Sequence, residues 1–139
     1  MILAVALGAA VLILLAKSCA TGPGFDYNGT WEGNRRLSNP GADPDALYTL
    51  GWVQLTIKDS RFNLLEGGMA TGGPVRFEGD HIVLHRETIL NNQPIGRAGP
   101  DAEKKYPDIS VTPQKDATLL FSNPAAIDGK PVVLMRKKP

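Results

Sequence analysis

The sequence predicts an all-β protein: an antiparallel up-and-down meander of about eight strands that closes into a small barrel, preceded by an N-terminal hydrophobic helix. Three observations lead to this prediction. From Gly29 onward, apolar and polar residues mostly alternate with a period of two, as in strands with one buried face. Pairs of turn-forming residues separate the alternating runs. No segment after residue 20 carries a helical apolar stripe of useful length.

The alternation is clearest in "WVQLTIKD", where Val53, Leu55 and Ile57 share one face. The segments expected as strands are TWEGNRRL, WVQLTIKD, RFNLLE, the two halves of PVRFEGDHIVLHRE, DISVT, DATLLFS and GKPVVLMRKK. The connections expected between them are Asp59-Ser60, Gly67-Gly68, Gly72-Gly73, Gly79-Asp80, Lys115-Asp116 and Asp128-Gly129. Because an open sheet of this size would leave exposed edges, we expect the meander to close into a barrel.

The amino-acid composition argues against a nucleic acid partner and against disulfide bonds within the chain. The 139 residues suffice for one domain, and the formal net charge of +1 supplies no basic field that would attract nucleic acid. The single cysteine excludes a disulfide within the chain. No nucleic acid partner, metal site or cofactor is expected.

The N-terminus reads as a targeting or anchoring segment. Residues 2–16, "ILAVALGAAVLILLA", contain no polar side chain, and as a helix they would span about 22 Å, less than the roughly 30 Å of a bilayer core. This length suits the apolar region of a signal peptide better than a full transmembrane helix. We therefore expect a signal peptide or membrane anchor over residues 1–19, a flexible tether over residues 20–28 and a barrel domain over residues 29–139.

Cys19, between small residues at the end of the apolar segment, is the candidate lipidation site. The first twenty residues resemble a bacterial lipoprotein signal. The resemblance implies cleavage before Cys19, transfer of diacylglycerol to its sulfur with fatty-acyl chains such as palmitate, and anchoring in the cell envelope. With Ala20 rather than aspartate after the cysteine, it favours the outer membrane over the inner. Two alternatives stay open: an uncleaved single-pass anchor, and a passive small residue at Cys19.

A second resemblance involves the first and last strands. Gly29-Thr30-Trp31 resembles the Gly-x-Trp signature of lipocalin-like barrels, and the wider pattern over residues 29–137 is similar to small bacterial lipocalin-like lipoproteins. The resemblance implies that Trp31 plugs one end of the barrel and that Arg136, on the last strand, lies across its ring. Such a cation–π contact is worth about 0.5–2 kcal/mol. The alternative is that Trp31 is an ordinary core residue and Arg136 a solvated charge.

The interior is expected to be mostly filled, because eight-stranded barrels hold little more than side chains. We expect at best a shallow cup at the end opposite Trp31, and no polar cluster inside the mouth. The side chains expected to point inward are Leu55, Ile57, Phe62, Leu64, Phe77, Ile82, Leu84, Phe121 and Leu134.

The longest connection, residues 91–108, is the candidate ligand or partner loop, because long loops in small domains are often functional. It carries Arg97, Lys104, Lys105 and Tyr106, which suit an anionic group or a partner protein. The alternative is a mobile surface loop.

Other chemistry is discounted. His81 and His85 are four residues apart on an expected strand, so about 13 Å separates them, too far to share a metal. Asp43 and Asp45 flank Pro44 and read as a turn. No phosphate loop, nucleophile elbow or zinc motif is present.

The sequence therefore predicts a non-enzymatic, membrane-tethered, extracytoplasmic binding module for a partner protein or a small apolar or anionic ligand. The alternative is an accessory subunit of a membrane complex, held by an uncleaved N-terminal helix.

Overall fold

A computed structural model describes residues 24–98 and 101–139; the side chains of residues 97, 98, 102 and 103 are also left undescribed. Cys19 and the expected signal or anchor, residues 1–19, lie outside the described residues, as do residues 20–23 of the expected tether. No helix within the described ranges has the length and apolar composition that crossing a bilayer requires.

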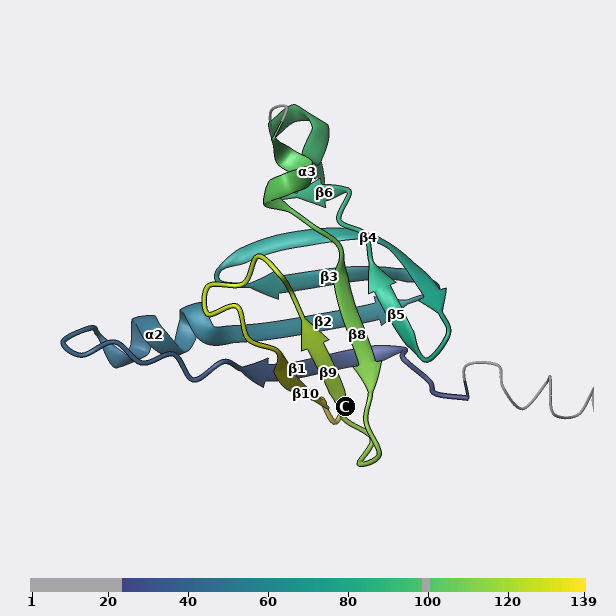
Figure 1. The fold of residues 1–139 in the computed structure, drawn as a ribbon, viewed down its shortest axis with the longest axis horizontal. Coiled ribbons are helices and arrows are strands. Elements are labelled where there is room, and N and C mark those ends of the chain that lie inside the picture. The colour runs from purple at the N-terminus through teal and green to yellow at the C-terminus, as the bar shows by residue number, and fades with distance from the viewer. Residues whose placement is uncertain (1–23, 99–100) are drawn as a thin grey trace, which may run out of the picture.

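Eight antiparallel strands close into a barrel, as the sequence predicts (Figure 1). The ring runs β3-β2-β1-β10-β9-β8-β5-β4, and a β3–β4 pairing closes it. The strands of the ring are β1 (Gly29–Asn34), β2 (Trp52–Lys58), β3 (Arg61–Glu66), β4 (Met69–Glu78), β5 (His81–Leu84), β8 (Ile109–Pro113), β9 (Leu119–Ser122) and β10 (Val132–Arg136). Each strand pairs with its neighbours in the chain's order, which is the expected meander.

The connection from β5 to β8 carries small elements of its own. It forms a hairpin of β6 (Thr88–Ile89) and β7 (Gln93–Pro94), a 3-10 turn η1 (Ile95–Ala98) and a one-turn helix α3 (Ala102–Lys105). β6 pairs with the first half of β4, whose second half pairs with β5. In Figure 1, α3 rises above the barrel at the top of the view.

Three expected turns are two-residue hairpin loops. They are fixed by the pairs Lys58↔Arg61, Glu66↔Met69 and Glu78↔His81. Both residues of the Asp59-Ser60 and Gly67-Gly68 loops have positive φ, as the hairpin turns that match strand twist require. The turns at Lys115-Asp116 and Asp128-Gly129 are also present.

The expectation of a turn at Gly72-Gly73 is wrong, because both residues lie within β4. The glycines serve close packing instead. A Cβ on Gly73 would lie 2.0 Å from the carbonyl oxygen of His85, so the chain leaving β5 passes directly over the strand. Only glycine permits this approach.

Replacing Gly73 with alanine is therefore expected to destabilise the fold by about 1–3 kcal/mol or more, because the backbone at His85 must move away. Urea denaturation followed by circular dichroism measures the change. Gly96→Ala is the matched control, since its added Cβ meets nothing within 4 Å. Equal stability of the two variants would contradict the close approach.

One helix was not expected: α2 (Pro44–Gly51) joins β1 to β2 where the sequence suggested only a turn. Asp43 is its N-cap, and the Asp43 carboxylate accepts a hydrogen bond of 3.0 Å from the Asp45 amide. Pro44 at the first helical position lacks an amide that would in any case be unpaired. Asp43 and Asp45 therefore start a helix.

The barrel interior is packed with apolar side chains. Of the nine residues expected to point inward, eight are buried. Phe77 is the exception, with 52% of its surface exposed. It shares the phase of buried Val75, but it lies near the end of β4, where its ring is 6.1 Å from that of Tyr27.

The chain before β1 closes one end of the barrel, at the right in Figure 1. Tyr27 is buried, and the ring of Phe25 lies 5.8 Å from that of Trp31. The Trp31 indole donates a 2.9 Å hydrogen bond to the Tyr27 carbonyl. Residues 25–28 are thus not free tether but pack on the barrel; they are called the N-terminal latch below.

Trp31 and Arg136 form the predicted pair. Trp31 is fully buried, and the Arg136 guanidinium carbon lies 4.2 Å from its ring centroid. The guanidinium also donates to the carbonyls of Asn28 at 2.5 Å and Asp26 at 2.6 Å, so it fastens the latch. A Cβ on Gly29 would lie 2.9 Å from Arg136 Nη1, which explains the glycine two residues before the tryptophan.

Candidate functional site

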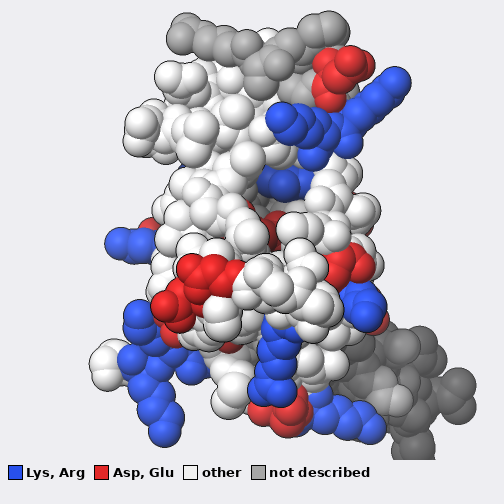
Figure 2. Space-filling model, turned by 90° about the vertical axis from the view of Figure 1, so that its left-hand side faces the viewer, with Lys and Arg blue, Asp and Glu red and all other residues white. Residues whose placement is uncertain are grey.

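A cavity of about 290 Å³ lies at the other end of the barrel, away from the N-terminal latch. Its walls come from the end of β1, the β3–β4 turn, the end of α3 and the loop between β9 and β10. Figure 2 faces this end and shows a hollow in which basic and acidic side chains lie below the surrounding surface. We call this cavity the mouth cup. It agrees with the expectation of a shallow cup opposite Trp31.

Arg35 forms one wall of the cup and is held from several sides. Its side chain is 1% exposed and forms an ion pair with Glu66. Its other terminal nitrogen lies 3.1 Å from the Asp128 carboxylate and donates a 2.5 Å hydrogen bond to the Lys130 carbonyl. Asn123 donates a 2.5 Å hydrogen bond to Glu66. This network ties β1, β3 and the β9–β10 loop together.

The electrostatics of the network follow from these contacts. The backbone amide of Lys130 and, secondarily, the Arg35 charge lower the pKa of the Asp128 carboxyl. Two carboxylates therefore balance one buried guanidinium, and both terminal nitrogens of Arg35 already bind the protein's own groups.

Arg86 forms the opposite wall and has fewer partners. It is 8% exposed, donates a 2.6 Å hydrogen bond to the Pro107 carbonyl and lies 5.3 Å from the Tyr106 ring centroid. Burial lowers the pKa of the guanidinium, while the charge of Glu66 opposes that shift. Among the described residues no carboxylate lies within ion-pair distance of Arg86.

Three buried polar atoms in the described part of the chain lack a hydrogen-bond partner, and the residues that carry them all line the mouth cup. They are Arg35 Nε, Thr71 Oγ1 and Arg86 Nε. An unpartnered buried donor costs about 1–3 kcal/mol. Their gathering around one cavity makes the mouth cup the candidate site, because a ligand or ordered water there would supply the missing partners.

The candidate loop of residues 91–108 contributes to the cup in part. Ile95 and Tyr106 are buried together against Met69 and Ile89, which anchors the loop to the mouth. Tyr106 and Lys105 line the cup, with Lys105 Nζ 5.6 Å from the Tyr106 ring, whereas Lys104 is exposed and does not line it. The backbone of Arg97 lies in η1, and its side chain lies outside the described residues.

The polar cluster in the mouth corrects the expectation that no such cluster exists. Arg35, Glu66, Arg86 and Asn123 occupy the ends of strands and the loops beyond them, where alternation no longer tells inside from outside. The sequence carried one signal, a charged residue at or just after the end of a strand. Glu66 is the last residue of β3 and Arg35 directly follows the last residue of β1, and both strands pair with β2.

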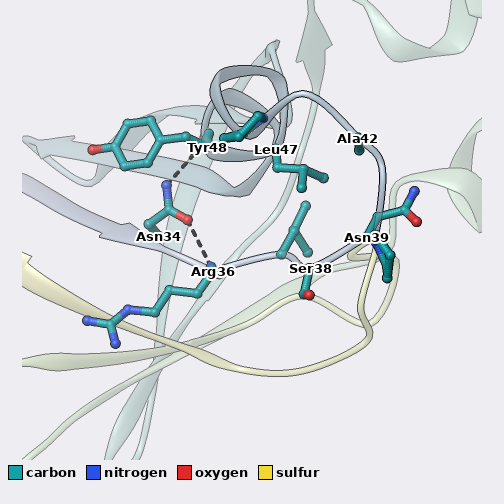
Figure 3. Close-up of a pocket in the computed structure, with 10 residues that line it drawn as sticks. Asn34, Arg36, Ser38, Asn39, Ala42, Leu47 and Tyr48 are labelled. Atoms are coloured by element: carbon teal, nitrogen blue, oxygen red, sulfur yellow. Dashed lines mark hydrogen bonds between the residues drawn. The ribbon is translucent and has the colours of Figure 1, made fainter.

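A larger hollow, about 650 Å³, lies within the β1–α2 connection (Figure 3). Asn34 organises it: its amide donates to the Tyr48 carbonyl at 2.9 Å, and its side-chain oxygen accepts from the Arg36 amide at 2.8 Å. None of its lining residues is buried, and its walls come from a single stretch of chain. The mouth cup, with buried charges from several elements, is therefore the stronger candidate.

The histidines do not form a site together. His81 Nδ1 lies 3.0 Å from Asp80, and His85 Nδ1 lies 2.7 Å from Asp108. Within residues 24–98 and 101–139, no three histidine, cysteine or acidic side chains gather as metal ligands would.

Comparison of the chain with protein-family models, with curated proteins and with solved structures finds no match.

Proposed function

We propose that this protein is an exported, membrane-tethered lipoprotein that binds a small ligand in its mouth cup and performs no chemistry on it. The observation that carries the proposal is the contrast between the two ends of the barrel. The latch and Trp31 fill one end, and the other keeps a cavity of about 290 Å³ with buried polar groups that have no partner among the described residues. That volume is close to the lower limit for small-molecule sites.

The tether and the cup fit one arrangement at a membrane. Cys19 precedes Phe25 by six residues, so a lipid on its sulfur would lie within about 20 Å of the latch. The closed end of the barrel then faces the bilayer and the mouth cup faces away from it. Ala20 after the cysteine, and the resemblance to lipoprotein signals, support the outer membrane of a bacterial envelope.

The absence of catalysis is proposed from the chemistry of the cup. The one carboxylate among the described lining residues, Glu66, is held by Arg35 and Asn123, so it is not free to accept a proton from a substrate. Arginine does not exchange protons at ordinary pH. The arrangement suits recognition of acceptor atoms, and the lipocalin-like pairing of Trp31 with Arg136 is in keeping with a binding module.

A second candidate is an accessory subunit of a membrane complex, anchored by an uncleaved N-terminal helix. The observation that favours it is a set of exposed apolar side chains beside the mouth. Tyr48 and Leu50 on α2 are 59% and 41% exposed, and Ile127 in the β9–β10 loop is 68% exposed. A partner protein would cover such side chains.

Mass spectrometry of the full chain, purified from membranes in mild detergent, separates the two candidates. We expect a mature protein that begins at a diacylated Cys19, with a small molecule that stays bound in the native spectrum and leaves on denaturation. An intact Met1 together with a co-purified protein and no small molecule would support the accessory subunit instead.

A further inference from the structure

We propose that the ligand of the mouth cup is a small organic acid whose carboxylate is bound by Arg86 and Thr71. This inference rests on the proposed function, because it names the chemical class of ligand for the same cavity. Its two proposed ligand-binding residues lie outside the loop that the sequence singled out, and that loop contributes Lys105 and Tyr106 to the lining of the cup.

The first argument is the inventory of unpartnered groups. Arg86 Nε is a donor with no acceptor among the described residues, and Thr71 Oγ1 is a hydroxyl with neither donor nor acceptor there. Both residues are more than nine-tenths buried and line the same cavity. A carboxylate offers acceptor oxygens only, and with two of them it satisfies a guanidinium and a hydroxyl together.

The second argument is charge. Among the described side chains, three cationic groups and one carboxylate line the cup: Arg35, Arg86 and Lys105 against Glu66. Arg35 is neutralised by its own ion pairs, whereas Arg86 is a buried charge with no ion-pair partner in the described part of the chain. A buried guanidinium is stabilised by an anion that enters its cavity. The Tyr106 ring, against which the Arg86 guanidinium packs, keeps the guanidinium in place.

The third argument is size and lining. A cavity of 290 Å³ has room for about ten non-hydrogen atoms if each takes roughly the 30 Å³ of a liquid water. Apolar side chains, among them Leu64, Met69 and Ile127, line the rest of the cup. One anionic group with a short apolar body matches this lining, and a multiply charged anion would meet Glu66.

The test uses three probes on the full chain in detergent: benzoate, its neutral counterpart benzyl alcohol, and inorganic phosphate. Backbone amide shifts of Thr71 and Tyr106, followed by NMR during titration, report binding in the cup. We expect benzoate to shift these resonances until the cup is saturated. Benzyl alcohol is expected to have an affinity at least about tenfold lower than that of benzoate, and phosphate is also expected to bind more weakly than benzoate.

Three variants assign the binding to its residues. Arg86→Met removes the charge and is expected to weaken benzoate binding about tenfold or more, with benzyl alcohol unaffected. Thr71→Val removes the unpartnered hydroxyl at nearly constant shape; it is expected to weaken benzoate binding several-fold without lowering the urea midpoint, so it tests the cup even if Arg86→Met folds poorly. Arg61→Met, which removes an exposed charge outside the cup, is expected to bind benzoate as the wild type does.

Each opposite result has a distinct meaning. Equal binding of benzoate and benzyl alcohol, tighter binding of phosphate, or unchanged benzoate affinity in both Arg86→Met and Thr71→Val would overturn the carboxylate inference and leave the cup as a binding site. If no probe shifts the cup resonances and native mass spectrometry finds no bound molecule, ordered water alone fills the cup and the proposed function fails as well.

Discussion

Replacing Trp31 with alanine is expected to lower the free energy of unfolding by about 3–5 kcal/mol, the usual cost of removing a large aromatic side chain from a core. Trp31 is 0% exposed, contacts Phe25 and lies beneath Arg136. The alanine variant loses the ring that the N-terminal latch packs on, so the latch is released along with the plug. Urea denaturation followed by far-ultraviolet circular dichroism measures the loss.

Trp52→Ala is the matched control, because Trp52 is the other tryptophan and is only partly buried, at the start of β2 beside Tyr48. Its truncation is expected to cost clearly less than that of Trp31. Similar losses in the two variants would contradict the role of Trp31 as the plug of the closed end. If Trp31→Ala does not fold, Trp31→Phe retains an aromatic ring and is expected to give a smaller, measurable loss.

Replacing Arg35 with methionine is expected to destabilise the protein by up to about 3–5 kcal/mol, because it leaves two partly buried carboxylate groups without their counter-charge. Arg35 is 1% exposed and pairs with both Glu66 and Asp128. The loss is expected to be largest near neutral pH and smaller in acid, because the Asp128 carboxyl, whose pKa the Lys130 amide and the Arg35 charge lower in the wild type, no longer needs a counter-charge once it is protonated. Thermal and urea denaturation at several pH values measure both effects.

Two further variants show whether the stability lost in Arg35→Met comes from the broken ion pairs or from lost side-chain packing. Arg61 forms an exposed pair with Glu87 at 3.7 Å, so Arg61→Met is expected to cost less than about 1 kcal/mol. Adding Glu66→Gln to Arg35→Met is expected to recover part of the stability, since it removes the carboxylate left uncompensated. A double variant no more stable than Arg35→Met would argue against the ion pair as the source of the loss.

The barrel was predictable because buried and exposed side chains alternate along most of the length of its strands. Buried side chains such as Leu55, Leu64 and Leu134 alternate with neighbours that are partly or fully exposed, and the two-residue turns carry residues that tolerate positive φ. Phe77 marks where this alternation ends: its phase is correct, yet β4 runs past the packed interior, so the ring is left half in solvent.

The mouth cup was predictable in position but not in chemistry. Its polar residues come from segments far apart in the chain. The alternation within one strand does not tell which residues of different strands and loops come into contact at the end of the barrel. Arg35 and Asp128, for example, are 93 positions apart. Helix α2 was missed for a different reason: Asp43 and Pro44 are an N-cap and a first-turn proline, but the helix is only eight residues long and mostly exposed.

The order of strands around the ring also governs when the barrel can be completed. Most pairings join neighbouring segments, but the seam between β1 and β10 joins Trp31 to Arg136, almost the full length of the described chain. During synthesis β1 therefore keeps one side unpaired until β10 has left the ribosome. A chain cut short before β10 would present two open strand edges, which favours aggregation over a partly working protein.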